Sequence, residues 1–338
     1  LAMTYEGARG QTASEMSSVL HLPVNDTIRR DGYATLVSGM NKGDGKSVLR
    51  TANALWLQND QKLLDSYLQD VRENYGGMAA PLDFKADPEG SRVHINNWVA
   101  NQTDDRIKDL IPSGLISERT KLVLTNAVYF KGEWVRQFNE TFTNEDDFRA
   151  GPGVVKKARL MHANDEFYYM ENELLQMLEL PYSGGNLSML ILLPKGDDIG
   201  PLESSFTTEN LEAWKKGLGT QEVQVYLPKF KFDTASMLGD TLQEMGMLQA
   251  FSDSADFSKM TGTKDLKISQ VVHKAFVEVD EKGTEAAAAT AVIMVPTSAG
   301  PGTHTSIPVF RADHPFIFII QQNGNILFMG RVSDPTTG

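Results

Sequence analysis

The chain has 338 residues, of which 41% are hydrophobic and 22% are charged, a balance ordinary for a globular protein with a large core. Its 44 acidic and 32 basic residues give a net charge of −12, which disfavours nucleic acid as a partner because phosphate binding needs clustered Lys and Arg. The apolar runs are too short to span a bilayer. Cysteine is absent, which excludes disulfides, thiolate metal sites and a cysteine nucleophile.

The first part of the chain is mainly helical in pattern. Apolar periodicity predicts helical segments over residues 1–42, broken at Pro23 and clearest over Thr27–Met40. Further segments follow in order: a β-rich stretch at Val48–Gln58, a helix at Leu63–Tyr75, a helix at Asp87–Gln102 and a strand at Lys121–Trp134. The last of these is almost continuously apolar, which is typical of a strand buried on both faces.

The second part of the chain is mainly β in pattern. The expected elements are short strands between Phe148 and Pro194, a helix at Glu209–Lys216, a strand at Glu222–Phe232, a helix at Ala235–Met247 and two final strands at Phe316–Gln321 and Ile326–Arg331. Helices early and strands late indicate an α+β fold in one domain over residues 1–338.

Catalytic motifs are missing from this sequence. Gly45-Lys46-Ser47 resembles a phosphate-binding loop, but Met40 stands where that motif requires its first glycine. The chain contains neither a G-x-S-x-G nucleophile elbow nor an H-E-x-x-H zinc motif, and its six histidines are scattered. The sequence therefore predicts no catalytic residues, no metal site and no cofactor, and the protein is not expected to be an enzyme.

The most informative stretch is Val271–Ala291. Phe276, Val277 and Val279 predict a strand that ends at a polar turn around Gly283. Helix propensity alone favours a short helix in the Ala-rich segment that follows. The β-rich flanks, and the long uncharged segment with several prolines and glycines that comes next, argue against a stable helix.

This stretch and several others resemble the serpin family. The sequence EKGTEAAAATA at residues 281–291 is similar to the serpin hinge, and DHPFIFII at 313–320 and FMGRVSDP at 328–335 are similar to the serpin signature and C-terminus. The sequences NAVYFKGEW at 126–134, LPKFKF at 227–232 and VVHKAF at 271–276 are also serpin-like and occur in serpin order. The resemblance covers essentially the whole chain.

The resemblance implies a mixed α/β domain with three β-sheets, about nine helices and an exposed reactive-centre loop at about residues 283–307. The first helix and first strand of the family, and the serine-bearing start of its second helix, would precede Leu1, so we expect these elements to be missing from the sequence. In the family, a serine protease attacks the loop as a suicide substrate. The cleaved loop then inserts into the main sheet and traps the acyl-enzyme.

The side chains of the hinge can be tested against that mechanism. The hinge comprises Glu281, Gly283, Thr284, Glu285, Ala286, Ala287, Ala288, Ala289 and Thr290. Because strand side chains alternate between faces, Thr284 and every second residue after it would enter the sheet core, and none of these is charged. Glu285 would remain in water on the other face. The composition therefore favours an inhibitor over the alternative, a serpin-fold carrier or interaction protein that does not inhibit.

The family usually has its scissile bond after the residue fourteen beyond the hinge glycine, which predicts the reactive bond Thr297–Ser298. The segment after this bond is longer than usual in the family, so Val295, Ser298 and Ala299 remain alternatives for the cleaved position. Lys and Arg are absent from Gly283 to Phe310, which argues against a trypsin-like target. The small and apolar side chains of this segment favour elastase-like or subtilisin-like proteases.

Other family positions match residues of this chain. The resemblance places Trp134, Lys229 and Glu281 in the breach, where the main sheet opens, and implies an ion pair between Lys229 and Glu281. It places Asn126 and His273 in the shutter, where side-chain hydrogen bonds hold the central strands closed.

The expected partner is a target serine protease in a covalent complex, and a monomer is expected otherwise. Between residues 24 and 50 there are five basic and three acidic side chains, an excess too small to favour a heparin-like polyanion. Neither nucleic acid nor a membrane is expected as a partner. The sequence leaves the compartment open, with an extracellular one slightly favoured.

Overall fold

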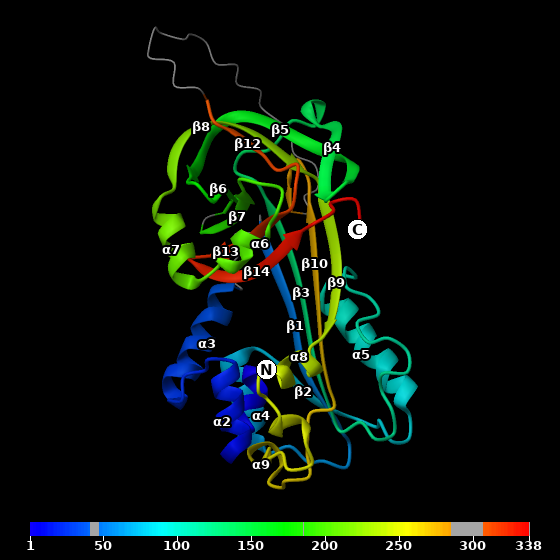
Figure 1. The fold of residues 1–338 in the computed structure, drawn as a ribbon. Coiled ribbons are helices and arrows are strands. Elements are labelled where there is room, and N and C mark those ends of the chain that lie inside the picture. The colour runs from blue at the N-terminus through cyan, green and yellow to red at the C-terminus, as the bar shows by residue number, and fades with distance from the viewer. Residues whose placement is uncertain (41–46, 185, 285–306, 338) are drawn as a thin grey trace. The chain divides into compact units, whose positions relative to one another are not determined.

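The fold is known from a computed structural model, which describes residues 1–40, 47–184, 186–284 and 307–337. These residues group into two compact units, each formed by three stretches of chain (Figure 1). The first unit contains Leu1–Lys42, Leu49–Tyr129 and Asp233–Phe276, and the second contains Gly43–Val48, Phe130–Phe232 and Val277–Gly338. Because the units interleave along the chain, strands β3 and β10 each begin in the first unit and end in the second.

Most helices belong to the first unit. They are α1 (Ala2–Glu6), α2 (Gly10–Val19), α3 (Asp26–Met40), α4 (Asp65–Tyr75), α5 (Pro88–Gln102), α8 (Gly239–Glu244), α9 (Ser258–Thr261) and the 3-10 turn η2 (Gln249–Phe251). The helix predicted at Asp87–Gln102 is confirmed as α5: the Asp87 side chain accepts a hydrogen bond from the Gly90 N–H, and Pro88 occupies the first turn, where its missing donor costs little.

The main sheet has six strands. Their order is β2 (Met78–Leu82), β1 (Ser47–Gln58), β3 (Leu122–Glu133), β11 (Gly283–Thr284), β10 (Gln270–Val279) and β9 (Phe230–Met237). Within the first unit, β3 and β10 pair directly and in parallel, from Val123 opposite Gln270 to Tyr129 opposite Phe276. This part of the sheet lies between two cores, because alternate residues of β1 point to opposite faces: Trp56 packs with residues of α5, and Leu55 packs with residues of α1, α2 and α4.

The second unit contains a larger sheet. Its strand order is β12 (Val309–Arg311), β8 (Gly219–Pro228), β5 (Val154–Glu171), β6 (Leu175–Pro181), β7 (Leu187–Pro194), β13 (Phe316–Gln322) and β14 (Asn325–Val332), and β4 (Asn144–Gly151) pairs with β5. The other elements are η1 (Glu140–Phe142), α6 (Gly200–Ser204) and α7 (Thr208–Lys216), and the two helices bury their apolar side chains on one face of this sheet. The described strands thus form two hydrogen-bonded sheets instead of the expected three, because the 18-residue strand β5 pairs with both β8 and β6.

Two other sequence predictions in this region were wrong. The strand expected at Glu222–Phe232 is two strands, β8 and β9, which meet at Lys229. Residues 235–237, expected to begin a helix, belong to β9, and α8 begins only at Gly239. Ala235 and Met237 are exposed in β9, so the apolar spacing that favoured a helix at these positions does not correspond to a buried face.

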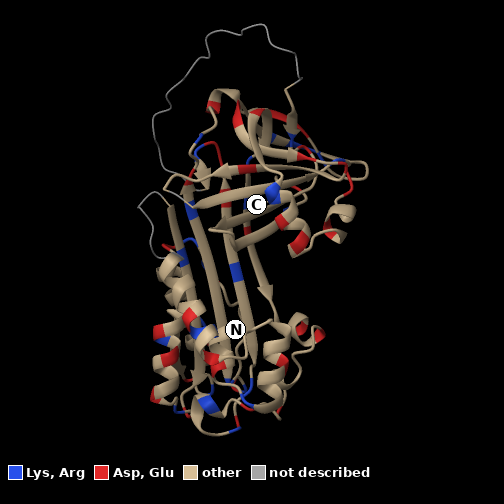
Figure 2. Ribbon diagram, turned by 90° about the vertical axis from the view of Figure 1, so that its left-hand side faces the viewer, with Lys and Arg blue, Asp and Glu red and all other residues tan. Residues whose placement is uncertain are grey.

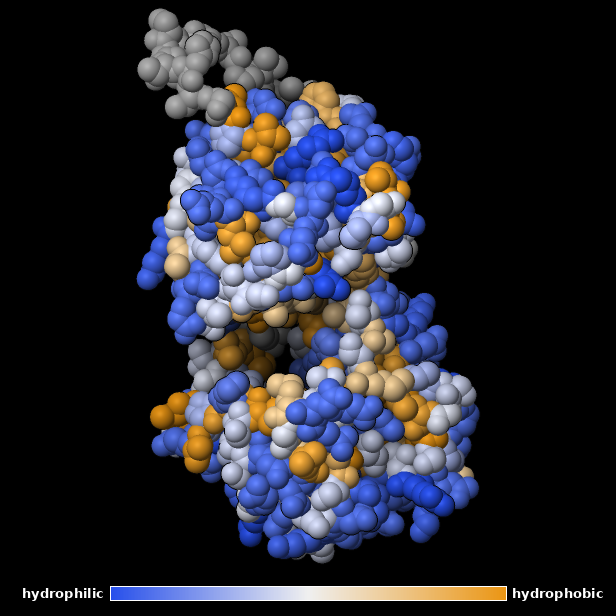
Figure 3. Space-filling view, in the orientation of Figure 1, coloured by the Kyte–Doolittle hydropathy of each residue, from blue (hydrophilic) through white to orange (hydrophobic). Residues whose placement is uncertain are grey.

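The surfaces of the units are mixed in character. Figure 2 shows acidic residues along the helices of the first unit with basic ones among them, and Figure 3 shows exposed apolar residues as small separate groups on the visible face. Among the residues that the structure describes, no helix combines the length and the apolar character needed to cross a membrane.

A buried ion pair joins α1 to α3 in the first unit. Arg29 and Glu6 have side chains that are each 1% exposed, and Arg29 Nη2 lies 2.7 Å from Glu6 Oε1. Arg30 donates to the second oxygen of Glu6 at 2.8 Å, and the Tyr75 hydroxyl donates to the first at 2.6 Å. All three donors depend on one carboxylate, so its loss would leave a buried guanidinium without its main partner.

We expect Glu6→Gln to lower the free energy of unfolding by about 3 kcal/mol, because breaking a buried pair leaves an uncompensated charge. The matched control is Glu89→Gln, which removes the exposed partner of Arg92 and should change the stability far less, because exposed ion pairs contribute little. Urea unfolding followed by far-UV circular dichroism measures both changes. Equal effects of the two substitutions would contradict the assignment of the Glu6 pair as a structural support.

Candidate functional site

The hinge begins inside the main sheet of the second unit. Gly283 lies opposite Glu133 and Thr284 opposite Gly132 in an antiparallel ladder with β3, and Thr284 also pairs with Val279 of β10. The Thr284 side chain is completely buried. The first residue after the hinge glycine thus already occupies a strand position between β3 and β10.

Only glycine fits at position 283. Its φ is +156°, and a Cβ atom there would lie 2.0 Å from the carbonyl oxygen of Gly132. A side chain would therefore force the hinge away from β3. The close approach of the two backbones explains why a glycine precedes the inserted threonine.

Trp134 holds the turn that leads into the hinge. Its backbone N–H donates to the carbonyl of Lys282 at 2.8 Å, and its indole N–H donates to the carbonyl of Asp280 at 3.0 Å. The ring stacks on Tyr182 with centroids 4.4 Å apart and planes inclined by 19°. One residue directly after β3 therefore contacts both ends of a three-residue turn, with its backbone at one end and its side chain at the other.

The ion pair that the resemblance implies is present next to this turn. Lys229 Nζ lies 2.6 Å from Glu281 Oε2, and the Thr143 hydroxyl donates to Glu281 Oε1 at 2.8 Å. Glu281 is 3% exposed, and its backbone carbonyl accepts from the Phe138 N–H. Burial opposes ionisation of Glu281, but the hydrogen bonds from Lys229 and Thr143 outweigh it and leave the pKa of this carboxyl below its usual value.

The shutter residues meet in the first unit. Asn126 and His273 lie opposite each other in the parallel β3–β10 ladder, and their side chains are hydrogen-bonded through Asn126 Oδ1 and His273 Nδ1. The amide of Asn126 donates to Asn53 Oδ1 on β1. The resulting chain of side chains links three strands, and burial lowers the pKa of His273, so the neutral imidazole is favoured.

A cavity of about 180 Å³ adjoins these shutter side chains. Asn53, Asn126 and His273 contribute to its wall, together with Thr4 of α1. The Thr4 hydroxyl is buried and has no hydrogen-bond partner among the described residues. Polar groups thus gather on one side of this cavity.

Sequence reasoning missed three of the contacting residues. Tyr182, Thr143 and Asn53 reach the hinge and the shutter from strands or turns far away in the chain, and no local pattern distinguishes them. The side-chain register of β1 against β3 would have been needed to find Asn53. Of the predicted site residues, positions 285–290 of the hinge and the bond Thr297–Ser298 lie outside the described residues.

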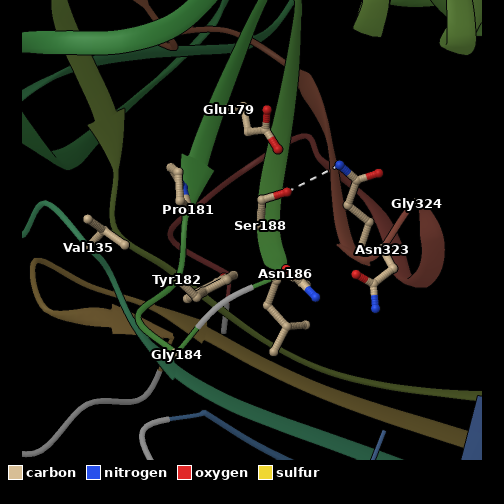
Figure 4. A pocket seen from close by; sticks show the side chains of 11 residues that line it. Val135, Glu179, Pro181, Tyr182, Gly184, Asn186, Ser188, Asn323 and Gly324 are labelled. Carbon is tan, nitrogen blue, oxygen red and sulfur yellow. Dashed lines mark hydrogen bonds between the residues drawn. The ribbon is translucent and has the colours of Figure 1, made fainter. Parts of the chain in front are cut away.

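A second pocket, of about 460 Å³, lies on the larger sheet (Figure 4). Glu179, Tyr182, Ser188 and Gln321 are among the residues that line it, and Gln321 Nε2 donates to Ser188 Oγ at 3.2 Å. In the described part of the chain, no group of three or more His, Asp or Glu side chains is arranged to hold a metal ion.

The breach ion pair makes a pH prediction. Because the folded-state pKa of Glu281 lies below its ordinary value of 4.5, its carboxylate stabilises the fold fully above pH 4.5, and this contribution is lost as the pH falls through the folded pKa. Glu281→Gln should therefore lower the thermal midpoint at pH 7, and the difference from the wild type should shrink below pH 4.5. Glu278→Gln, which removes the partially exposed partner of Lys231, is the control and should have little effect. A Glu281→Gln deficit that persists unchanged at pH 3.5 would contradict this account.

The shutter histidine predicts a second pH effect. Its folded pKa lies below 6.5, so the unfolded chain binds more protons and stability declines as the pH falls from 6.5 to the folded pKa. His273→Gln should remove part of this decline, measured as thermal midpoints between pH 7.5 and 5. The matched substitution is His162→Gln, because burial also lowers the pKa of His162. Unchanged pH dependence in the His273 variant would exclude a neutral, buried histidine at the shutter.

The comparisons with known proteins agree with this geometry. The chain matches the family model for serpins (serine protease inhibitors) over residues 1–335. It is 45% identical to an uncharacterized serpin-like protein of Thermococcus kodakarensis, a match covering all of this chain and 79% of that protein. It is 40% identical to the leukocyte elastase inhibitor of Bos taurus, covering 99% of this chain and 90% of that protein. Among solved structures, human thyroxine-binding globulin in complex with its ligand has a TM-score of 0.88 at 28% identity, covering 99% of this chain and 88% of that one. The chain belongs to the serpin family.

Proposed function

We propose that this serpin inhibits serine proteases as a suicide substrate. The observation that supports the proposal most directly is the buried position of Thr284 between β3 and β10. A loop whose first residue already pairs antiparallel to β3 can extend the same ladder by adding residues in register. In this proposal the loop can therefore become a further strand of the main sheet.

The chemistry belongs to the protease. Its serine oxygen attacks the carbonyl carbon of Thr297, the peptide bond to Ser298 breaks, and the new amine leaves with a proton, so that an ester joins the two proteins. The freed segment from Thr284 to Thr297 then inserts between β3 and β10. Insertion removes the ester from the geometry in which water would attack it, and the covalent complex persists. In this mechanism the native state is held by a kinetic barrier, because the inserted form has more strand pairing.

The alternation of side chains along the hinge fits this mechanism. Residues 286, 288 and 290 share the face of Thr284, and they are Ala, Ala and Thr, which are small and uncharged. A charged side chain on this face would be buried without a partner. Glu285 falls on the other face. The sequence of the hinge thus permits insertion without the desolvation of a charge.

The target is an elastase-like or subtilisin-like protease. The loop offers no Lys or Arg to a trypsin-like pocket, and Val295, Thr297 and Ala299 suit a shallow apolar one. The relative from Bos taurus is a leukocyte elastase inhibitor by name, which agrees with this preference. Val295, Ser298 and Ala299 remain the alternatives to Thr297 as the cleaved residue.

The second candidate is a serpin-fold carrier. Two observations favour it: the similarity to thyroxine-binding globulin and the pocket of about 460 Å³, which is within the usual size range of small-molecule sites. A carrier requires no loop insertion. The two candidates therefore differ in one property, the fate of a protease that cleaves the loop.

The test is incubation with elastase-, subtilisin-, chymotrypsin- and trypsin-class proteases, followed by denaturing electrophoresis. An inhibitor gives a band at the summed mass of the two proteins, and mass spectrometry of the released peptide locates the cleaved bond. Cleavage of the loop with no such band for any of the proteases would favour the carrier instead.

Thr284→Arg should convert the inhibitor into a substrate, because the arginine would have to be buried between β3 and β10 without a partner. The band at the summed mass should fall by at least about tenfold, in favour of cleaved inhibitor and free protease. Glu285→Arg is the matched control, since it adds the same side chain on the face that stays in water. Equal trapping by the two variants would refute an insertion in which residue 284 faces the sheet core and residue 285 faces water.

A further inference from the structure

Among the described residues, the hydroxyl of Thr284 is hydrogen-bonded to a tyrosine. Tyr182 Oη lies 2.6 Å from Thr284 Oγ1, and either atom can be the donor. Tyr182 is 1% exposed and Thr284 is fully buried. Each hydroxyl therefore satisfies the other in a place that water does not reach, and the loss of either would leave its partner unpaired.

Tyr182 itself is held rigidly. Its ring stacks on Trp134 and contacts the edge of Phe130, with centroids 4.9 Å apart and planes inclined by 76°. Its backbone forms a β-bridge with Trp134 and donates from its N–H to the carbonyl of Leu187 at 2.9 Å. The tyrosine is thus held by two aromatic contacts and by its backbone, independently of the hinge, and Figure 4 shows it at the end of β6 beside Pro181.

The strand opposite the hinge is shaped to admit this ring. A Cβ atom on Gly132 would lie 2.8 Å from the Tyr182 ring and 2.7 Å from the Phe130 ring. Gly132 is also the residue that pairs with Thr284. The absence of a side chain at this position lets the tyrosine hydroxyl reach the residue across the ladder.

We propose that Tyr182 positions the hinge for loop insertion, holding Thr284 by its hydroxyl between β3 and β10 so that the inserting strand starts in a fixed register and on a fixed face. This inference rests on the proposed inhibitory function and adds to it a residue outside the expected breach and shutter sets. A seated Thr284 commits every second residue after it to the sheet core, because a shift by one residue would exchange the two faces. Insertion then begins from a state that is populated before the protease arrives.

The position of Thr284 matters because insertion competes with hydrolysis of the acyl-enzyme. If the seated fraction of molecules falls, the effective rate of insertion falls by the same fraction. More inhibitor is then cleaved for each protease molecule trapped. The proposed reactive bond is separated from Thr284 along the sequence and does not include it, so the rate of the first attack by the protease should not change.

The experiment uses Tyr182→Phe, which keeps the ring and removes only the hydroxyl, and Thr284→Val, which keeps the shape of threonine without its hydroxyl. Amide hydrogen exchange at residues 283–284, measured without protease, should become about tenfold faster in each variant, since one buried hydroxyl loses its partner. The double variant should be no worse than either single one, because both remove the same bond. Thr284→Ser retains the hydroxyl and should exchange like the wild type.

The second readout is the number of inhibitor molecules consumed per protease trapped. It should rise about tenfold in Tyr182→Phe and in Thr284→Val and remain unchanged in Thr284→Ser. Tyr169→Phe is the control, since Tyr169 is 2% exposed and also loses a hydroxyl bond, here to Gln176, within the same unit but away from the hinge. This control should leave both readouts at the wild-type values.

The outcomes separate the two proposals. An unchanged rate of amide exchange at residues 283–284 in Tyr182→Phe would refute the positioning of Thr284 by Tyr182, whether or not the wild type traps a protease. Faster amide exchange, with an unchanged number of inhibitor molecules consumed per protease trapped, would refute a role of Tyr182 in insertion. A wild type that is cleaved without trapping any protease would refute the inhibitory function while the exchange result still decides whether Tyr182 seats Thr284.

Discussion

The direct pairing of β3 with β10 is the constraint on which the rest of the structure depends. Seven residue pairs join these strands in parallel, and a new strand can enter only by replacing them. Parallel ladders are slightly less stable per residue than antiparallel ones, and an inserted strand would be antiparallel to both neighbours. In the proposed mechanism, insertion of the loop would therefore give this sheet a more stable arrangement. In this view the side chains around β3 and β10 act on the barrier as much as on the stability of the native fold.

Two groups of side chains act on that barrier, one in each unit. The shutter hydrogen bonds from His273 through Asn126 to Asn53 are short-range and directional, so they resist separation of the strands without adding charge. At the hinge the resistance is electrostatic, since Glu281 is buried and depends on Lys229 and Thr143 for its ionised form. Within each group the polar contacts share a central residue, Asn126 in one and Glu281 in the other, so substitution of that residue would remove more than one contact.

The sequence anticipated the residues that form motifs and missed those that only contact them. Trp134, Lys229 and Glu281 lie in stretches with recognisable order. The strands next to Trp134 and Glu281 were predicted close to their observed bounds, whereas Lys229 stands at a break between β8 and β9 that was not predicted. Tyr182 follows β6 at a turn with no distinctive pattern, and its role depends on the stacking with Trp134 and on a glycine at position 132. Such a site exists only once three separate strands are in register, which periodicity cannot supply. The joining of the expected second and third sheets into one has the same origin, because the length of β5 was hidden by its polar middle.

Position 284 has two requirements, small size and a directional bond, and alanine would meet only the first. The first inserted residue must be small enough to lie opposite Gly132 and next to the Tyr182 ring, yet it must also hold its place before the rest of the strand exists to hold it. Alanine meets the first demand and offers no directional bond. Threonine meets both, since its β-branched side chain favours the extended backbone and its hydroxyl bonds to Tyr182. In the proposed insertion, the residues that follow would pair with strands on both sides as they enter, so they need only be small, which agrees with a threonine followed mainly by alanine.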